Sequence, residues 1–207
     1  MNNKSLLILI LYLRGARSLA WIRRRPSEPK ILGSNPSGPI KMILELTKDH
    51  QLKLTGHRRE IARLHQRGIG ISIEGYSLIV SPIEAIWLIR EEIAKEFFID
   101  GIKVEANEFE DKLIQADKDI LVKYIVFKHL FSIGFKLADT LDENAFLFKH
   151  KSMEKMLIVS VLYEEDQIEV GKLLKTLEKY SKFHVPILVA IVDRLGDIIF
   201  YEATSLE

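Results

Sequence analysis

The side chains that could do chemistry are scattered along this chain and match no known catalytic pattern. Its six histidines stand at positions 50, 57, 65, 129, 150 and 184, without the His-Glu-x-x-His spacing of a zinc site. There is no Gly-rich phosphate loop and no Gly-x-Ser-x-Gly nucleophile elbow. Cysteine is absent, which excludes disulfides, thiolate ligands and cysteine nucleophiles. We therefore predict no metal site and no cofactor.

Two weaker patterns have an ordinary structural interpretation. His57 and His65 lie eight residues apart on a basic segment, which indicates a solvated helix face more often than a metal pair. The acidic run Glu164-Glu165-Asp166 could bind a cation, but acids in that place are also expected to cap the helix that follows. We favour the structural interpretation for both.

Charge is distributed unevenly between the start of the chain and the rest. Of the 30 basic and 29 acidic residues, residues 1–41 hold eight Lys or Arg and one acid, Glu28. The remainder therefore has 22 basic and 28 acidic residues, a net charge of −6. A protein that grips nucleic acid through bulk charge alone is normally basic. We expect no general cationic surface on the body of this protein.

Within residues 1–41, the segment 14–39 has no helical or strand period and carries four of the six prolines. The apolar run Leu6–Leu13 is only eight residues long, too short to span a membrane. One hypothesis is a disordered basic tail. We prefer another: the codons available for Leu32–Ser37 can spell the T-arm of a tRNA gene, so that translation begins at Met42. On this second hypothesis, nothing in residues 1–41 contributes to function.

The rest of the chain predicts an α+β fold in two small mixed domains, residues 42–116 and 117–207. In the first, we expect strands at 42–46, 51–55, 69–80 and 102–105, and helices at 57–67, 83–97 and 107–115. Ser81-Pro82 is a strong helix start, and Asn107 is the expected cap of the third helix. In the second, we expect helices at 119–133 and 170–180 and strands at 135–138, 145–149, 156–162, 186–192 and 198–201.

Three segments, in order and with matching spacing, resemble the archaeal tRNA-splicing endonuclease family. The family signature Tyr-x-Val-Tyr-x-x-Leu-x-x-Arg-Gly-Tyr is similar to Tyr124-Ile-Val-Phe-Lys-His-Leu-Phe-Ser-Ile-Gly-Phe135. The family's closing Val-Asp-x-x-Gly-Asp turn resembles residues 192–197, and its Leu-Ser-x-x-Glu-Ala helix start resembles residues 80–85. The resemblance implies a restriction-endonuclease-like second domain, with a central mixed sheet flanked by helices.

The family cuts bulge–helix–bulge RNA with a Tyr, His and Lys triad, which acts as base, acid and charge stabiliser in this lyase reaction. The aligned positions here carry Phe148, Met153 and Val185, so the resemblance implies that the triad is lost. The family's docking loop corresponds to Asp193–Asp197, in which Asp193 and Asp197 are the expected anchors. The same residues also suit a plain hairpin turn.

The resemblance therefore implies that this chain is the structural, non-catalytic subunit of a cytoplasmic tRNA-splicing endonuclease. Its partners would be a catalytic paralogue, in a heterotetramer of two of each, and pre-tRNA; no membrane is involved. One alternative is an active tRNA-intron endonuclease with a displaced triad drawn from Tyr163, His150 and Lys182. Another is a binding module outside splicing that reuses the fold.

Overall fold

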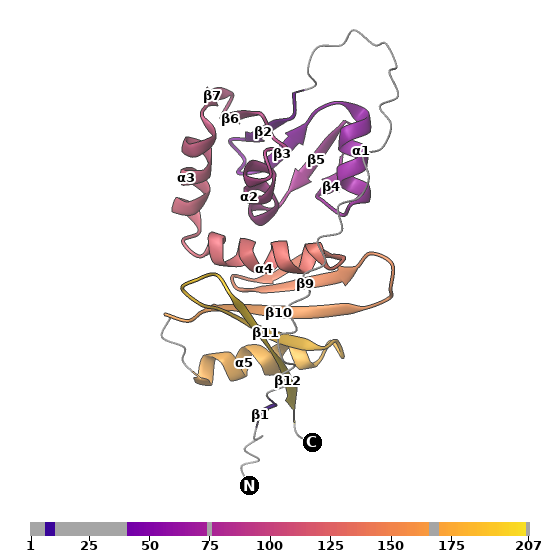
Figure 1. Cartoon of the computed structure of the whole chain (residues 1–207), viewed down its shortest axis with the longest axis vertical. Coiled ribbons are helices and arrows are strands. Elements are labelled where there is room, and N and C mark those ends of the chain that lie inside the picture. The colour runs from indigo at the N-terminus through magenta and orange to yellow at the C-terminus, as the bar shows by residue number, and fades with distance from the viewer. Residues whose placement is uncertain (1–6, 11–40, 74–75, 166–169, 206–207) are drawn as a thin grey trace.

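The protein is an α+β fold built on two six-stranded sheets, which confirms the predicted class. The computed structural model describes residues 7–10, 41–73, 76–165 and 170–205 (Figure 1). One sheet is formed by residues 42–116, and the other by residues 117–207 together with Leu7–Ile10. In the part of the chain that is described, no helix is both long and apolar enough to cross a membrane.

The first sheet is mixed, because β2 and β6 are parallel and its other neighbours are antiparallel. Its strand order is β4 (Ile71–Ser72), β5 (Ser77–Val80), β3 (Leu52–Thr55), β2 (Ile43–Leu46), β6 (Glu96–Ile99) and β7 (Ile102–Val104). Its helices are α1 (Arg58–Gln66), α2 (Pro82–Arg90) and α3 (Ala106–Ala116). Leu44, Leu54 and Leu78 are cross-strand neighbours and fully buried, so they form the middle of this unit's core.

Helix α2 begins as predicted but ends earlier. The Ser81 hydroxyl accepts a hydrogen bond from the Glu84 amide, and the Glu84 carboxylate accepts one from the Ser81 amide, which makes a capping box. The predicted extension to Phe97 is wrong, because Phe97 pairs with Leu44 in the parallel β2–β6 ladder. The apolar residues keep their helical spacing beyond Arg90, where α2 ends. The residues that follow pair with β2 as a strand instead of continuing the helix. The predicted Asn107 cap is also wrong: α3 starts at Ala106 without a side-chain cap.

The second sheet is mixed as well, and helices cover both of its faces. Its order is β1 (Leu7–Ile10), β12 (Ile198–Ser205), β11 (Ile187–Val192), β10 (Met156–Tyr163), β9 (Ala145–His150) and β8 (Phe135–Asp142). Only β10 and β11 are parallel, and α5 (Val170–Ser181) makes the crossover between them. Helix α4 (Ile120–Ser132) lies on the opposite face, between the two sheets (Figure 1).

The core is continuous across the predicted domain boundary. Helix α4 packs on α2 on one side and on β8, β10 and β11 on the other. The Trp87 ring on α2 lies 5.1 Å from the Phe131 ring on α4. One cluster of buried apolar residues therefore runs from Leu44 in the first sheet to Phe148 in the second. A smaller cluster around Leu177 lies beneath α5.

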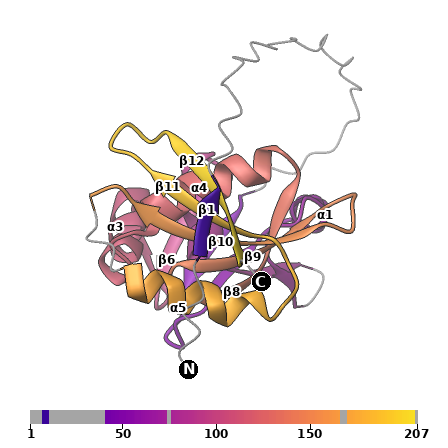
Figure 2. The same cartoon turned by 90° about the horizontal axis from the view of Figure 1, so that it is seen from below.

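Part of the amino-terminal segment is structured. Leu7–Ile10 form β1, which pairs antiparallel with β12 at the edge of the second sheet (Figure 2). These four residues are therefore a strand and not a disordered tail. The predictions for residues 1–6 and 11–40 lie outside the described residues.

Candidate functional site

The predicted docking loop is a tight turn that Asp193 closes from within. The Asp193 amide donates to the Asp197 carbonyl over 3.0 Å, and the Gly196 amide donates to the Asp193 carbonyl over 3.1 Å. One carboxylate oxygen of Asp193 also accepts from the Leu195 and Asp197 amides, at 2.8 and 2.9 Å. Gly196 has a φ of +86°, which a residue with a side chain rarely adopts. The hydrogen bonds of Asp193 therefore serve to form the turn.

The outer surface of the loop presents an apolar tip beside a free carboxylate. The Leu195 side chain is 88% exposed, the highest value among the large apolar residues described. Asp197 is exposed, and its carboxylate makes no hydrogen bond or ion pair within the described part of the chain. Ile199, which follows in β12, is 53% exposed. The sequence analysis did not single out Leu195 as a contact residue. A leucine in a turn that otherwise holds charged residues and glycine would have indicated one.

The loop is tied to the turn that follows β10. The Arg194 guanidinium lies 2.9 Å from the Glu165 carboxylate, in an exposed ion pair that contributes about 0–1 kcal/mol. This pair gives Glu165 a basic partner within the protein. Asp166, the third member of that turn, lies outside the described residues.

The three positions aligned with the family's catalytic triad lie at one end of the second sheet, but Phe148 packs in the cluster under α4 and Val185 in the cluster under α5. Phe148 is 1% exposed and pairs with Leu157 near the start of β10. Met153 lies in the β9–β10 turn, and Val185 lies two residues before β11. The Ile158 amide binds the carbonyl of Pro186, which brings Val185 to the same end of the sheet. None of the three can supply a proton or a positive charge.

The displaced triad Tyr163, His150 and Lys182 is not brought together. His150 ends β9 beside the start of β10, whereas Tyr163 ends β10, seven residues farther on. At about 3.3 Å per residue this places their backbones roughly 23 Å apart, beyond the reach of the two side chains. His150 instead caps the β9–β10 turn, since its Nδ1 accepts from the Ser152 and Met153 amides at 3.2 and 3.1 Å.

The remaining candidates are structural. His57 caps α1 by accepting from the Arg59 amide, and the His65 ring lies 3.3 Å from the Gly70 carbonyl. These separate partners support the solvated-helix interpretation of the pair. Among the described residues, no three His, Asp or Glu side chains are grouped closely enough to hold a metal ion.

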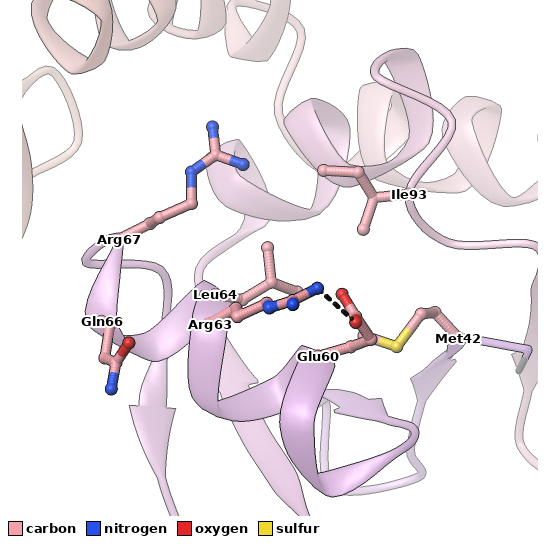
Figure 3. Close-up of a pocket in the computed structure, with 7 residues that line it drawn as sticks. All are labelled: Met42, Glu60, Arg63, Leu64, Gln66, Arg67 and Ile93. Carbon is pink, nitrogen blue, oxygen red and sulfur yellow. Dashed lines mark hydrogen bonds and ion pairs between the residues drawn. The ribbon is translucent and has the colours of Figure 1, made fainter. Parts of the chain in front are cut away.

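A pocket beside α1 has no arrangement suited to catalysis. It is lined by Met42, Glu60, Arg63, Leu64, Gln66, Arg67 and Ile93 (Figure 3). Glu60 and Arg63 neutralise each other in a 2.8 Å ion pair. The Arg67 side chain points away from this pair, toward the neighbouring helices (Figure 3).

A search against models of known protein families finds no match to this chain. Function is therefore inferred from the residue patterns and from the geometry of the loop and the aligned positions.

Proposed function

We propose that this chain is the structural, non-catalytic subunit of a tRNA-splicing endonuclease, which removes introns from pre-tRNA at bulge–helix–bulge sites. It would act by assembling with a triad-bearing catalytic paralogue into a heterotetramer of two of each. In an archaeal cell such a complex would work in the cytoplasm.

One observation carries this proposal: the positions of Phe148, Met153 and Val185 lie at the same end of the second sheet. In a family member these positions would hold Tyr, His and Lys, and a shared end of one sheet is where a triad would have to meet. Their place at one end of the sheet supports the alignment, and their apolar side chains support the loss of catalysis. The separation of Tyr163 from His150 argues against the displaced triad.

The β11–β12 loop supports a role in assembly. A protruding leucine beside an unpaired carboxylate suits a partner groove with an apolar floor and basic walls. Asp197 would pair with a partner Lys or Arg, and Leu195 would be buried on binding. Asp193 would hold the loop in the shape that presents them.

The test is cleavage of a bulge–helix–bulge RNA by this protein alone, by the triad-bearing paralogue alone, and by the two mixed. We expect strong cleavage only in the mixture, together with a mass that corresponds to a tetramer. Cleavage by this chain alone would mean that it is an enzyme in its own right. A failure of the two proteins to associate would refute the structural-subunit role.

A further inference from the structure

Three cations from distant parts of the chain meet where α2 packs on α4 and the end of α1 approaches β8. Arg67 follows α1, Lys136 lies in β8 and Lys151 lies in the β9–β10 turn. The Arg67 guanidinium lies 5.3 Å from the Trp87 ring centroid and 5.7 Å from that of Phe131. The Lys151 ammonium lies 3.8 Å from the same Phe131 centroid. Such contacts with ring faces help to fix where these charges lie.

Lys136 is held beside the other two by close packing on a glycine. A Cβ added to Gly68 would lie 2.7 Å from the Lys136 Cβ, so the lysine stem lies directly on the Gly68 backbone. Gly68 has a φ of +88° and follows Arg67 in the chain. The first unit and β8 therefore form this cluster together, and neither would form it alone.

No carboxylate of the described residues forms an ion pair with any of these three cations. By contrast Arg90, Lys123 and Lys128, which lie nearby on α2 and α4, each have an acidic partner. The pKa of Lys151 is lowered, first by burial and then by the positive charges of Arg67 and Lys136. Lys149, directly opposite Lys136 in the β8–β9 register, adds a fourth charge. Like charges this close repel one another, and an anion bound among them would offset that repulsion.

We propose that Arg67, Lys136 and Lys151, called here the junction patch, bind backbone phosphates of RNA. The identity of the anion as RNA rests on the proposed function, whereas the demand for an anion rests on the geometry. An RNA backbone supplies closely spaced charges that can meet several cations at once, and a guanidinium can bind a phosphate through two hydrogen bonds. The patch would give an acidic body one local contact with the substrate.

An acidic protein is a poorer occupant than RNA. Protein interfaces are centred on aromatic or aliphatic side chains that partner contacts bury. Here the two aromatic side chains are already buried, Trp87 at 4% and Phe131 at 8% exposure, and cations lie over them. These two rings therefore have little area left for a partner to bury, whereas the charges above them suit a phosphate backbone.

The test measures binding of the full chain to a fluorescently labelled bulge–helix–bulge RNA at several salt concentrations. The variant is the triple Arg67→Gln, Lys136→Gln, Lys151→Gln. The matched control is the triple Lys48→Gln, Lys112→Gln, Lys118→Gln, which removes the same number of positive charges. These three lysines are exposed, have no ion pair among the described residues and lie outside the junction patch. Circular dichroism checks that both variants are folded.

We expect the junction-patch variant to weaken binding by about 10-fold or more near 0.1 M salt and to lower the slope of log affinity against log salt by roughly 2 to 3. The control should change affinity by less than about 3-fold. Equal losses in the two variants would overturn the proposal, because bulk charge would then explain binding. Displacement of the RNA by polyglutamate as effectively as by unlabelled RNA of equal charge would also overturn it in favour of an acidic protein.

Failure of this inference can be told apart from failure of the proposed function. If the mixture with the paralogue cleaves RNA while the junction-patch variant binds RNA normally, the patch proposal fails alone. If the variant loses RNA affinity but the two proteins never associate, the patch stands as an RNA site and the splicing-subunit role fails.

Discussion

At the scale of single residues, Lys123 is a charged side chain buried in the described core. Its side chain is 2% exposed, and its ammonium lies 2.8 and 2.7 Å from the two carboxylate oxygens of Asp117. Asp117 is a third exposed, so it links the buried cation to the surface. A buried charge that loses its partner destabilises the folded state far more than a surface pair does.

We therefore expect Asp117→Asn to lower the free energy of unfolding by about 3 kcal/mol, because it leaves the Lys123 ammonium buried and uncompensated. The double variant Asp117→Asn, Lys123→Met should recover to within about 1 kcal/mol of the wild type. Urea denaturation measures both. A loss below about 1 kcal/mol for Asp117→Asn would show that water compensates the lysine.

Glu84 is the buried carboxylate of the described residues, and it gives a pH-dependent prediction. Burial raises its pKa above the ordinary value of 4.5, although bonds from Gly70 and Ser81 act in the opposite direction. The folded state then binds the proton more tightly than the unfolded state, so the stability that Glu84 contributes is largest below pH 4.5 and declines as pH rises through the folded pKa.

Glu84→Gln removes this titration and also misplaces an amide against the Gly70 or Ser81 donors. We expect the variant to be less stable by about 1–3 kcal/mol, with the stability difference from wild type shrinking as pH rises above 4.5. Urea denaturation from pH 4 to 8 tests this. A pH-independent difference would contradict the assignment.

At the scale of elements, different residues of the β11–β12 turn stabilise its fold and face the proposed partner. The Asp193 carboxylate accepts hydrogen bonds from two amides inside the turn, whereas the Asp197 and Leu195 side chains are exposed. Asp193→Ala should therefore cost about 1 kcal/mol of stability and weaken assembly only through the loop shape.

Asp197→Asn and Leu195→Ala should each weaken association with the catalytic paralogue by about 10-fold, while thermal stability stays unchanged. Sedimentation of mixed subunits gives the affinity, and melting curves give the stability. Arg194→Ala, which loses only an exposed ion pair with Glu165, is the matched control and should assemble normally. Assembly that is insensitive to both outward residues would remove this loop from the interface.

The elements also show where sequence reasoning succeeds and where it stops. Local chemistry predicted the α2 start at Ser81-Pro82, because the cap needs only neighbours in the chain. It misplaced the α2 end, because Phe97 is placed by a strand 53 residues away, at Leu44. The junction patch was invisible for the same reason: Arg67, Lys136 and Lys151 are brought together only by packing between the two units.

At the scale of the whole molecule, α4 joins the two sheets through one apolar core. Phe127 is 1% exposed, its ring lies 5.4 Å from that of Phe131, and Phe131 in turn meets Trp87 of the first unit. A domain able to fold alone has its own core, whereas here one apolar cluster crosses the boundary at residues 116 and 117. Loss of packing at α4 should therefore destabilise both sheets.

We expect Phe127→Ala to lower the free energy of unfolding by about 3–5 kcal/mol and to speed hydrogen exchange equally at Leu54 in β3 and Val189 in β11. Ile71→Ala, at a side chain that is 72% exposed, should change neither amide by more than about 0.5 kcal/mol. Native-state exchange monitored residue by residue distinguishes the two cases. Faster exchange confined to β11 would mean that the sheets unfold independently, and the junction patch would then depend on a docking equilibrium between them.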